Sequence, residues 1–420
     1  MYSRYIRLIA VCRVILCPSF LIIGALLASI VRAEDSRGFV SVRGSQIVDS
    51  KGQAIHLRGT NLGGWLLPEG YMFLFERINA PRQLEDMVAQ LIGDQPAKHF
   101  WEKWRESYIT RDDIRLIKRA GFDSVRVPFS YRLFIENEDV SRMEGPGWER
   151  MDRVIGWCRD EGLYVILDMH AAPGGQSGDN IDDSRGYPFL FENEESQTMA
   201  VALWKKIAAR YKNETTVLGY DLLNEPITPF FDNARLFPRV EPLYKRMVAA
   251  IREVDPHHIC ILAGPGWITD VSVFGKPFAP NLVYTFHAYH EQPTVERLKP
   301  YLEFRAKYDV PLWLGESGED KDEWISAFRQ VLEKNDIGWC FWPYKRMGDA
   351  ACTMTVPTPA DWALVKTFAE APRGTFTEIR KARPKGEAAS KALDELLLNV
   401  QAAHGRINKG YLEALGLRVP

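Results

Sequence analysis

The chain has 420 residues, of which 46% are hydrophobic and 26% are charged, and its formal net charge is −2. This is an ordinary globular composition with enough apolar residues for a large core, built as one large barrel or as two average domains. The slight acidity and the lack of basic tracts argue against nucleic acid as a partner.

Residues 1–33 have the features of a secretory signal peptide. Three arginines precede an apolar run over residues 14–31, and small residues stand at the usual cleavage positions before residue 34. The run is close to the length that spans a bilayer, so an uncleaved membrane anchor is the alternative. In either case we expect a periplasmic, extracellular or envelope-attached protein with no other membrane contact. Removal of the segment takes away four arginines and no acids, which leaves a formal charge of −6.

No pattern for a metal or another cofactor stands out. Four cysteines remain beyond the signal peptide, without CxxC spacing, and no disulfide can be assigned from their positions. Cys340 lies in an apolar segment and is interpreted as a buried thiol. His287 and His290 are close in sequence, but neither an HExxH pattern nor a clear third ligand accompanies them. We therefore expect no metal and no cofactor.

The predicted elements begin with a small β-hairpin lid. Residues 39–43 and 46–49 alternate apolar and polar side chains around a Gly-Ser turn, and they lead into a first buried strand at residues 54–58. A helix then starts at a capping-box-like sequence over residues 110–113 and stops at Gly121.

From this helix onward, apolar strands alternate with amphipathic helices. Further strands are predicted at residues 124–129, 164–170, 217–226, 259–264, 282–289, 311–316 and 337–342, and helices at residues 148–161, 196–212, 240–253, 294–307 and 321–334. Eight such units favour an α/β fold with a closed (β/α)8 TIM barrel. We assign the catalytic domain to residues 34–383 and a helical tail to residues 384–420, in which residues 388–400 form an amphipathic helix packed on the barrel.

Loop lengths indicate which end of the barrel carries the function. The connections from helix to strand are short, whereas long segments follow the first three strands at residues 63–109, 130–147 and 171–195. Barrel enzymes build their sites from the loops at the carboxyl ends of the strands. The sequence therefore predicts a site at that face.

Two glutamates end the predicted fourth and seventh strands, Glu225 and Glu316. Retaining cleavage of a glycosidic bond needs two carboxyl groups about 5 to 5.5 Å apart, one to protonate the leaving oxygen and one to attack the anomeric carbon. A closed barrel brings these two strand ends together. For either glutamate alone, a structural salt bridge is the alternative.

Asn224 immediately precedes Glu225, and its amide is predicted to donate to the sugar 2-hydroxyl. Adjacent residues of a regular strand point to opposite sides, so both side chains reach one site only if the strand end is distorted. The proline at position 226 favours such an ending. The alternative is an asparagine that only forms a turn.

His287 and Tyr289 are two residues apart on the predicted sixth strand and therefore share one face. The phenol can hydrogen-bond a carboxylate nucleophile, and Arg126 on the second strand adds an opposite charge, so both favour an ionised Glu316. Glu225 is then the carboxyl group that stays protonated. A structural ion pair is the alternative for Arg126.

Ring-bearing residues at other strand ends complete the prediction. His170 is expected to hydrogen-bond sugar hydroxyls, with a structural role as the alternative. Trp342 is expected to stack against a pyranose ring, as are Trp65, Trp267 and Phe129, with core packing as the alternative for each.

The strand-four sequence NEP (residues 224–226) together with Gly315-Glu316 resembles glycoside hydrolase family 5, whose acid/base and nucleophile end strands four and seven. The resemblance covers residues 38–370. Residues 57–66 (LRGTNLGGWL) and 170–176 (HAAPGGQ) are similar to the exo-β-1,3-glucanase branch and its bacterial endoglucanase relatives. The insertion at residues 67–109 does not match the fungal exo-enzymes. The substrate site can therefore be either a closed pocket or an open cleft.

The resemblance implies a monomeric retaining hydrolase that cleaves β-1,3- or β-1,4-glucosidic bonds, or both, of a β-glucan or a related oligosaccharide. It implies Glu225 as the acid/base, Glu316 as the nucleophile, and supporting roles for Arg126, His170, Asn224, His287, Tyr289 and Trp342. The alternatives are a β-mannan or other β-glycoside hydrolase of the same family, and a non-catalytic glycan-binding barrel.

Overall fold

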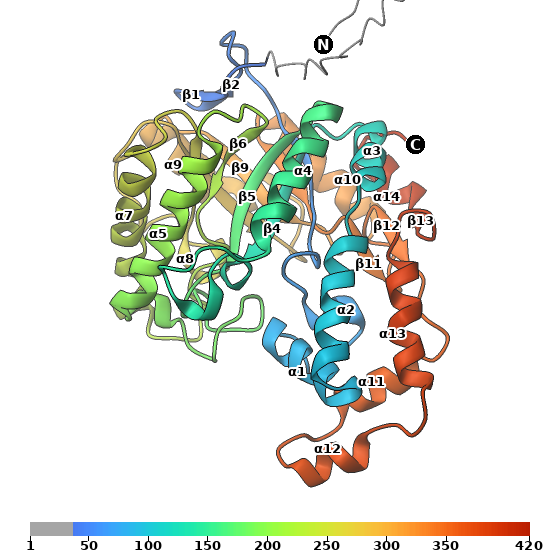
Figure 1. Cartoon of the computed structure of the whole chain (residues 1–420). Helices are drawn as coiled ribbons and strands as arrows, with labels where there is room; N and C mark the ends of the chain where they lie inside the picture. The colour runs from blue at the N-terminus through green and yellow to red at the C-terminus, as the bar shows by residue number, and fades with distance from the viewer. Residues whose placement is uncertain (1–36) are drawn as a thin grey trace, which may run out of the picture. The chain divides into compact units, whose positions relative to one another are not determined.

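Eight parallel strands close into a barrel at the centre of the structure, a computed structural model that describes residues 37–420 (Figure 1). The strands are β3 (Arg58–Asn61), β4 (Ser124–Ser130), β5 (Tyr164–Ala171), β6 (Val217–Asp221), β7 (Ile259–Ala263), β8 (Leu282–Ala288), β9 (Leu312–Ser317) and β10 (Gly338–Phe341). Each strand pairs with its neighbours in this order, and β10 pairs with β3. The predicted TIM barrel is confirmed, whereas the predicted signal peptide lies outside the described residues.

Helices cover the outer face of the barrel. They are α3 (Arg111–Ala120), α4 (Gly147–Glu161), α5 (Glu194–Tyr211), α7 (Val240–Arg252), α9 (Val295–Tyr308) and α10 (Asp322–Lys334). In α3, the Asp113 carboxylate accepts the Thr110 backbone N–H at 2.7 Å, and Gly121 ends the helix at φ +101°. Within residues 37–420, no helix combines the length and the apolar character needed to cross a bilayer.

The N-terminal hairpin closes the end of the barrel opposite to the carboxyl ends of the strands. It consists of β1 (Ser41–Arg43) and β2 (Gln46–Val48). Val40 and Ile47 pack in one apolar cluster with Leu218 and Ile259, which lie near the starts of their strands. The expected lid therefore does not cover the strand ends where the site was predicted. Instead, it shields the amino-terminal mouth of the barrel from water.

The first barrel strand was predicted too early in the chain. Residues 54–57 precede β3, which begins at Arg58. The Ile55 backbone N–H donates to the Ile47 carbonyl at 3.0 Å, and Ala54 forms a bridge with Val48. The apolar segment is thus paired with the hairpin, because its backbone groups find partners there before the chain enters the barrel.

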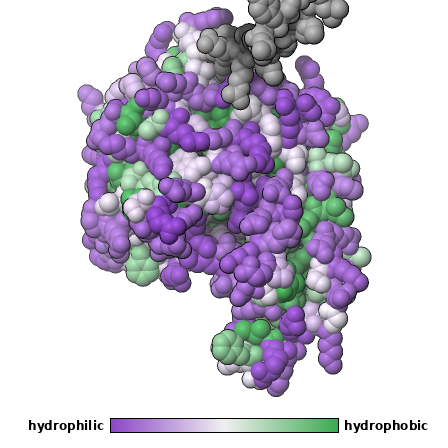
Figure 2. Space-filling view, in the orientation of Figure 1, coloured by the Kyte–Doolittle hydropathy of each residue, from purple (hydrophilic) through white to green (hydrophobic). Residues whose placement is uncertain are grey.

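A second group of helices packs beside the barrel. The insertion after β3 forms α1 (Pro81–Ile92) and α2 (Asp94–Ser107), and the C-terminal part forms α11 (Trp362–Glu370), α12 (Phe376–Ala382), α13 (Ala388–Asn399) and α14 (Lys409–Ala414). The predicted tail helix, α13, packs mainly on α2 and α11, and α14 packs on α10 (Figure 1). The face seen in Figure 2 is mostly hydrophilic, with hydrophobic residues gathered over these C-terminal helices.

A buried lysine ties the C-terminal part to the barrel. Lys345 lies in β11 (Lys345–Met347), which forms a small sheet with β12 (Met354–Val356) and β13 (Arg406–Ile407). Its ammonium group donates to the carbonyls of Tyr108 and Val400, both at 2.7 Å, and pairs with Asp113 at 2.5 Å. Three segments far apart in the sequence therefore meet at one fully buried charge.

Candidate active site

A pocket of about 410 Å³ opens at the carboxyl ends of the barrel strands. Seven of the eight residues that the sequence singled out line it, namely His170, Asn224, Glu225, His287, Tyr289, Glu316 and Trp342. Arg126 is fully buried beneath the pocket and contacts Glu316. The structure therefore gathers all eight residues at one place.

The strand end before Glu225 is distorted, as the sequence requires. β6 ends at Asp221, five residues before the predicted end, and Glu225 and Ile227 have φ values of +42° and +48°. Residues other than glycine rarely adopt this left-handed backbone conformation, which costs on the order of 1 kcal/mol or more per residue. The Gln176 amide donates to the Asn224 carbonyl at 2.9 Å and compensates for the lost strand pairing. Asn224 and Glu225 consequently line the same pocket.

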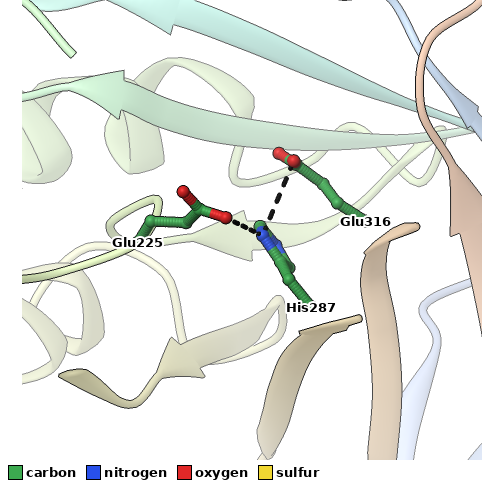
Figure 3. A group of neighbouring side chains, drawn as sticks. All are labelled: Glu225, His287 and Glu316. Carbon is green, nitrogen blue, oxygen red and sulfur yellow. Dashed lines mark hydrogen bonds and ion pairs between the residues drawn. The ribbon is translucent and has the colours of Figure 1, made fainter. Parts of the chain in front are cut away.

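The two glutamates face each other across His287 (Figure 3). One oxygen of Glu225, one oxygen of Glu316 and a ring nitrogen of His287 all lie within 4.8 Å of one another. His287 Nδ1 is 2.7 Å from Glu225 Oε1 and 3.5 Å from Glu316 Oε2. This separation of the carboxyl groups fits the double-displacement geometry of retaining hydrolases.

Glu316 is held by a cation and a phenol. The Arg126 guanidinium donates to Glu316 Oε1, and the Tyr289 hydroxyl donates to Oε2 at 2.9 Å. Both contacts fix the position of the carboxylate. Gly315 allows the close approach, because a Cβ atom there would lie 2.7 Å from Thr285 Oγ1 and 3.0 Å from the His287 ring. A bulkier residue before Glu316 would displace both neighbours.

Arg126 is itself fixed from several sides. It pairs with Asp221 at 2.8 Å and with Asp168 at 3.1 Å, and it donates to the amide oxygen of Asn224 at 2.9 Å. This last bond fixes the orientation of the amide, so that its NH₂ group points away from the guanidinium. The Nδ2 atom of Asn224 lies 3.2 Å from Nε2 of His170.

Burial gives Glu225 the properties of a proton donor. Removal from water raises the pKa of Glu225 to about 7 and lowers the pKa of His287 to about 3 and that of His170 to about 4. Both imidazoles are therefore neutral near pH 7, and burial favours the protonated form of Glu225. Glu225 remains 13% exposed, which leaves it open to a ligand in the pocket.

Several pocket residues were missed in the sequence. Glu69 and Tyr71 come from the insertion after β3, and Glu319 follows β9. Tyr71 accepts a hydrogen bond from Trp342 Nε1 at 2.6 Å, and Glu319 pairs with Arg346 at 2.6 Å. Their only signal in the sequence is that they follow strand ends, which many residues without a role also do.

Glu69 carries an unsatisfied polar atom. Its side chain is 3% exposed, and Oε1 has no hydrogen-bond partner among the described residues. Burial, together with the nearby carboxyl groups of Glu316 and Glu319, raises the pKa of Glu69 well above its usual value. A buried polar atom that lines a pocket is available to bind a ligand.

The aromatic predictions divide into two groups. Trp342 and Trp267 line the pocket, and the Trp342 ring is stacked on His170 with a centroid distance of 5.5 Å. Trp65 and Phe129 belong to the core instead. The Trp65 indole N–H donates to the Arg105 carbonyl at 2.8 Å, which fixes the ring against the insertion. Their positions near strand ends did not distinguish these two roles.

The carboxyl pair and His287 are the one group of metal-ligand atoms that are close enough together, among residues 37–420, to hold an ion. The Arg126 guanidinium, however, already contacts Glu316 Oε1, and Tyr289 occupies Oε2. The fixed positive charge of the guanidinium repels a metal cation from the same carboxylate. The donor set therefore fits proton transfer and nucleophilic attack better than metal binding, and the expected absence of a metal stays a prediction.

A TIM barrel with a buried acid and a guanidinium-paired carboxylate at this spacing is the arrangement of retaining glycoside hydrolases. The chain belongs to the family described as Cellulase (glycosyl hydrolase family 5), whose family model matches residues 84–348, more than half of the chain. The predicted family is confirmed.

Named relatives agree with this membership. The Beta-xylosidase of Phanerodontia chrysosporium is 32% identical over 71% of this chain and 61% of its own length. Endoglucanase C of Acetivibrio thermocellus is 27% identical over 58% of this chain and 85% of its own length. The chain thus spans less than two thirds of the Beta-xylosidase.

The fold also matches a solved structure. The Thermotoga maritima enzyme Cel5A, solved in complex with cellobiose, superposes with a TM-score of 0.54 at 20% identity. The match covers 86% of this chain and 97% of the other. At this level of identity the likeness establishes the barrel architecture.

Proposed function

We propose that the protein is a retaining β-glycoside hydrolase that cleaves β-glucosidic bonds of a β-glucan. The observation that carries the proposal is the pair Glu225 and Glu316, whose oxygens lie within 4.8 Å of each other in opposite electrostatic surroundings. Burial raises the pKa of Glu225 and favours its protonated form, while Arg126 and Tyr289 donate hydrogen bonds that position the Glu316 carboxylate.

The first step transfers the sugar to the enzyme. A carboxylate oxygen of Glu316 attacks the anomeric carbon, and the bond from that carbon to the leaving oxygen breaks. The leaving oxygen takes the proton of Glu225, so the leaving group departs as a neutral alcohol. His287 contacts both carboxyl groups and keeps them at their separation.

The second step releases the sugar. A water molecule takes the place of the leaving group beside Glu225, which is now ionised and accepts a proton from it. The water oxygen attacks the anomeric carbon, and the bond to Glu316 breaks with its electron pair returning to the carboxylate. Both groups are then back in their starting protonation states.

The substrate assignment draws on the named relatives and on the Asn224 amide. The relative named Endoglucanase C favours a β-glucan. Because another relative is named Beta-xylosidase, a β-xyloside is the first alternative substrate to test. The Asn224 NH₂ group, turned away from the guanidinium, is the donor that we assign to the sugar 2-hydroxyl.

The proposal is tested with Glu225→Ala and Glu316→Ala on aryl β-glucosides, β-xylosides and β-mannosides, followed by laminarin, lichenan, carboxymethylcellulose and mannan. We expect each variant to lose at least about 10³-fold in kcat. Azide should then yield β-glucosyl azide with Glu225→Ala and α-glucosyl azide with Glu316→Ala, because it replaces a different group in each variant.

Glu387→Ala is the matched control, since Glu387 is an exposed carboxylate in the C-terminal part. Its activity should equal that of the wild type. Undiminished activity in either site variant would overturn the roles given to the glutamates. A wild-type protein that binds glycans but cleaves none of them would favour the non-catalytic barrel.

We also propose that the protein is exported, on the basis of the N-terminal sequence. The mature N-terminus, read by mass spectrometry after expression with an export pathway, should begin at Glu34. A full-length chain held in the membrane fraction would indicate the uncleaved anchor, and a full-length chain in the cytoplasm would contradict export.

A further inference from the structure

We propose that α12 and the residues around it form a docking surface for an anionic lipid bilayer, in which the Phe376 ring enters the headgroup region and neighbouring cations contact the lipid phosphates. These cations are Arg380, Lys381 and Lys385. The inference does not depend on the proposed hydrolysis, since none of these residues lines the pocket. It gives the C-terminal part a second function, which is to hold the protein at an envelope surface.

The segment at residues 373–385 is basic within an acidic protein. It holds five cationic side chains and one carboxylate, a formal charge of +4, whereas residues 34–420 as a whole carry −6. The rest of that chain therefore carries −10. Only Arg380 and Lys381 are adjacent, so the sequence shows no continuous basic run. Because the local charge is opposite to that of the rest of the molecule, an anionic partner is attracted to this segment alone.

Two arginines fix the segment to the insertion after β3. The Arg373 guanidinium donates to the side-chain oxygen of Gln90 at 2.6 Å, and Arg383 Nε donates to the Leu91 carbonyl at 3.1 Å. Gln90 and Leu91 lie in the last turn of α1. The segment is therefore anchored on both sides of α12, which keeps the orientation of the helix fixed.

The outward side of α12 combines an aromatic ring with cations. Ile379 and Ala382 pack against the apolar core and define the inner side of the helix. Phe376, Arg380 and Lys381 lie on the remaining sides by helical spacing, and all three are exposed. Phe376 is 87% exposed, the highest value among the large apolar side chains of residues 37–420. An apolar ring flanked by cations is the combination that binds at the interface of an anionic bilayer.

Three cations of the segment have no carboxylate partner among residues 37–420, namely Arg380, Lys381 and Lys385. The nearest carboxylates in the sequence are engaged elsewhere. Glu378 accepts the Thr375 backbone N–H at 2.9 Å, and Glu387 pairs with Lys391 at 3.3 Å. The protein itself therefore does not neutralise these three charges, which leaves them available to lipid phosphates.

The position of α12 suits contact with an extended surface. The helix lies at the outer end of the C-terminal helices, away from the barrel, and hydrophobic and hydrophilic residues stand side by side at this end (Figures 1 and 2). The β1–β2 hairpin lies at the opposite end of the molecule (Figure 1). A bilayer bound by α12 therefore lies on the side to which the carboxyl ends of the barrel strands point, and the pocket faces that surface.

The ring favours a bilayer over a soluble polyanion. Cations alone attract any polyanion, whereas Phe376 gains free energy only where an apolar phase can receive it. The surface departs from the expectation of no membrane contact beyond the N-terminal segment. That expectation rested on the sequence, which does not reveal that the ring and the three cations lie exposed on one anchored helix and its flank.

The test measures co-sedimentation of the protein that begins at Glu34 with two kinds of vesicle. One kind is phosphatidylcholine alone, and in the other about a quarter of the lipid is anionic phosphatidylglycerol. We expect binding to the anionic vesicles only, and release at about 1 M salt. Arg380→Gln combined with Lys381→Gln should weaken binding about 25-fold, or about 5-fold per cation. Phe376→Ala should weaken it about 5- to 10-fold, and Phe376→Trp should bind as the wild type does.

Matched controls change the same groups elsewhere. Lys299→Gln combined with Lys307→Gln removes the same charge from exposed positions of α9, and Phe230→Ala removes a ring that is 66% exposed. Both should bind as the wild type does. Equal binding by all variants, or equal binding to both kinds of vesicle, would overturn the docking surface. Binding to alginate, a soluble anionic polysaccharide, without binding to vesicles would overturn it as well. No cleavage is measured, so either result leaves the proposed function intact.

Discussion

His287 Nδ1 lies 2.7 Å from Oε1 of Glu225, although the two residues are 62 positions apart in the chain. His287 lies in β8, whereas Glu225 follows β6. The ring is neutral, because burial lowers the pKa of His287 to about 3. A neutral ring can keep the Glu225 carboxyl group in place without removing its proton. The contact therefore links the orientation of the acid to strand β8.

We predict that His287→Ala impairs proton donation more than nucleophilic attack. The loss in kcat/KM should reach about 100-fold for alkyl or sugar leaving groups, which need a proton, and should be much smaller for 2,4-dinitrophenolate, which does not. The measurement is the dependence of the rate on the pKa of the leaving group. A uniform loss across the series would indicate a merely structural role for His287.

The pH dependence of kcat/KM should follow the protonation of Glu225. Burial raises the pKa of Glu225 to about 7, and the free enzyme needs the protonated form. The rate should accordingly decline about tenfold per unit above pH 7. Glu225→Gln, measured on an activated aryl glucoside, should lose this decline. A wild-type profile that stays flat to pH 9 would contradict the assignment of the acid.

The same pKa shift predicts an effect on stability. The pKa of Glu225 is raised in the folded state from 4.5 to about 7, so ionisation disfavours folding. The associated stability is complete below pH 4.5 and is lost as the pH rises through 7, by up to about 3 kcal/mol. Glu225→Gln should therefore melt at a higher temperature relative to the wild type near pH 8 than near pH 4. If the two proteins differed in melting temperature by the same amount near pH 4 and near pH 8, the raised pKa of Glu225 would be contradicted.

Asn224→Ala tests the contact with the sugar 2-hydroxyl. The Asn224 amide oxygen is held by Arg126 at 2.9 Å, which leaves the NH₂ group as the donor. We expect a loss of about 100-fold in kcat/KM on a β-glucoside and a far smaller loss on the matching 2-deoxyglucoside. If both substrates lose equally, the amide acts on the protein and not on that hydroxyl.

Lys345→Met should destabilise the fold without touching the pocket. The substitution removes a buried ammonium group and leaves the Asp113 carboxylate and the carbonyls of Tyr108 and Val400 without it. We expect a loss of about 3 to 5 kcal/mol in the free energy of unfolding, measured with urea. Lys366→Met, which breaks an exposed pair with Glu76, is the control and should cost less than about 1 kcal/mol. Equal losses in the free energy of unfolding for the two variants would show that the buried contacts of Lys345 do not stabilise the fold.

Much of the barrel could be predicted because its signals are local. Apolar periodicity located the helices that cover the barrel and seven of the eight strands, but not α1 and α2 of the insertion, and Gly121 marked a helix end that the structure retains. The hairpin was placed correctly along the chain, but the sequence did not indicate which end of the barrel it covers. Alternation identifies a strand, whereas its partner is chosen by tertiary packing, here with Leu218 and Ile259.

The sequence by itself determined which groups carry the chemistry, since it places Glu225 and Glu316 at the ends of the predicted fourth and seventh strands. Only the tertiary structure decided how those groups differ. His287 between the carboxyl groups, the pKa of Glu225 and the unpartnered oxygen of Glu69 all depend on burial and on distances between segments far apart in the chain. Electrostatic properties of this kind arise from the surroundings of a side chain, and a residue's place in the sequence does not contain them.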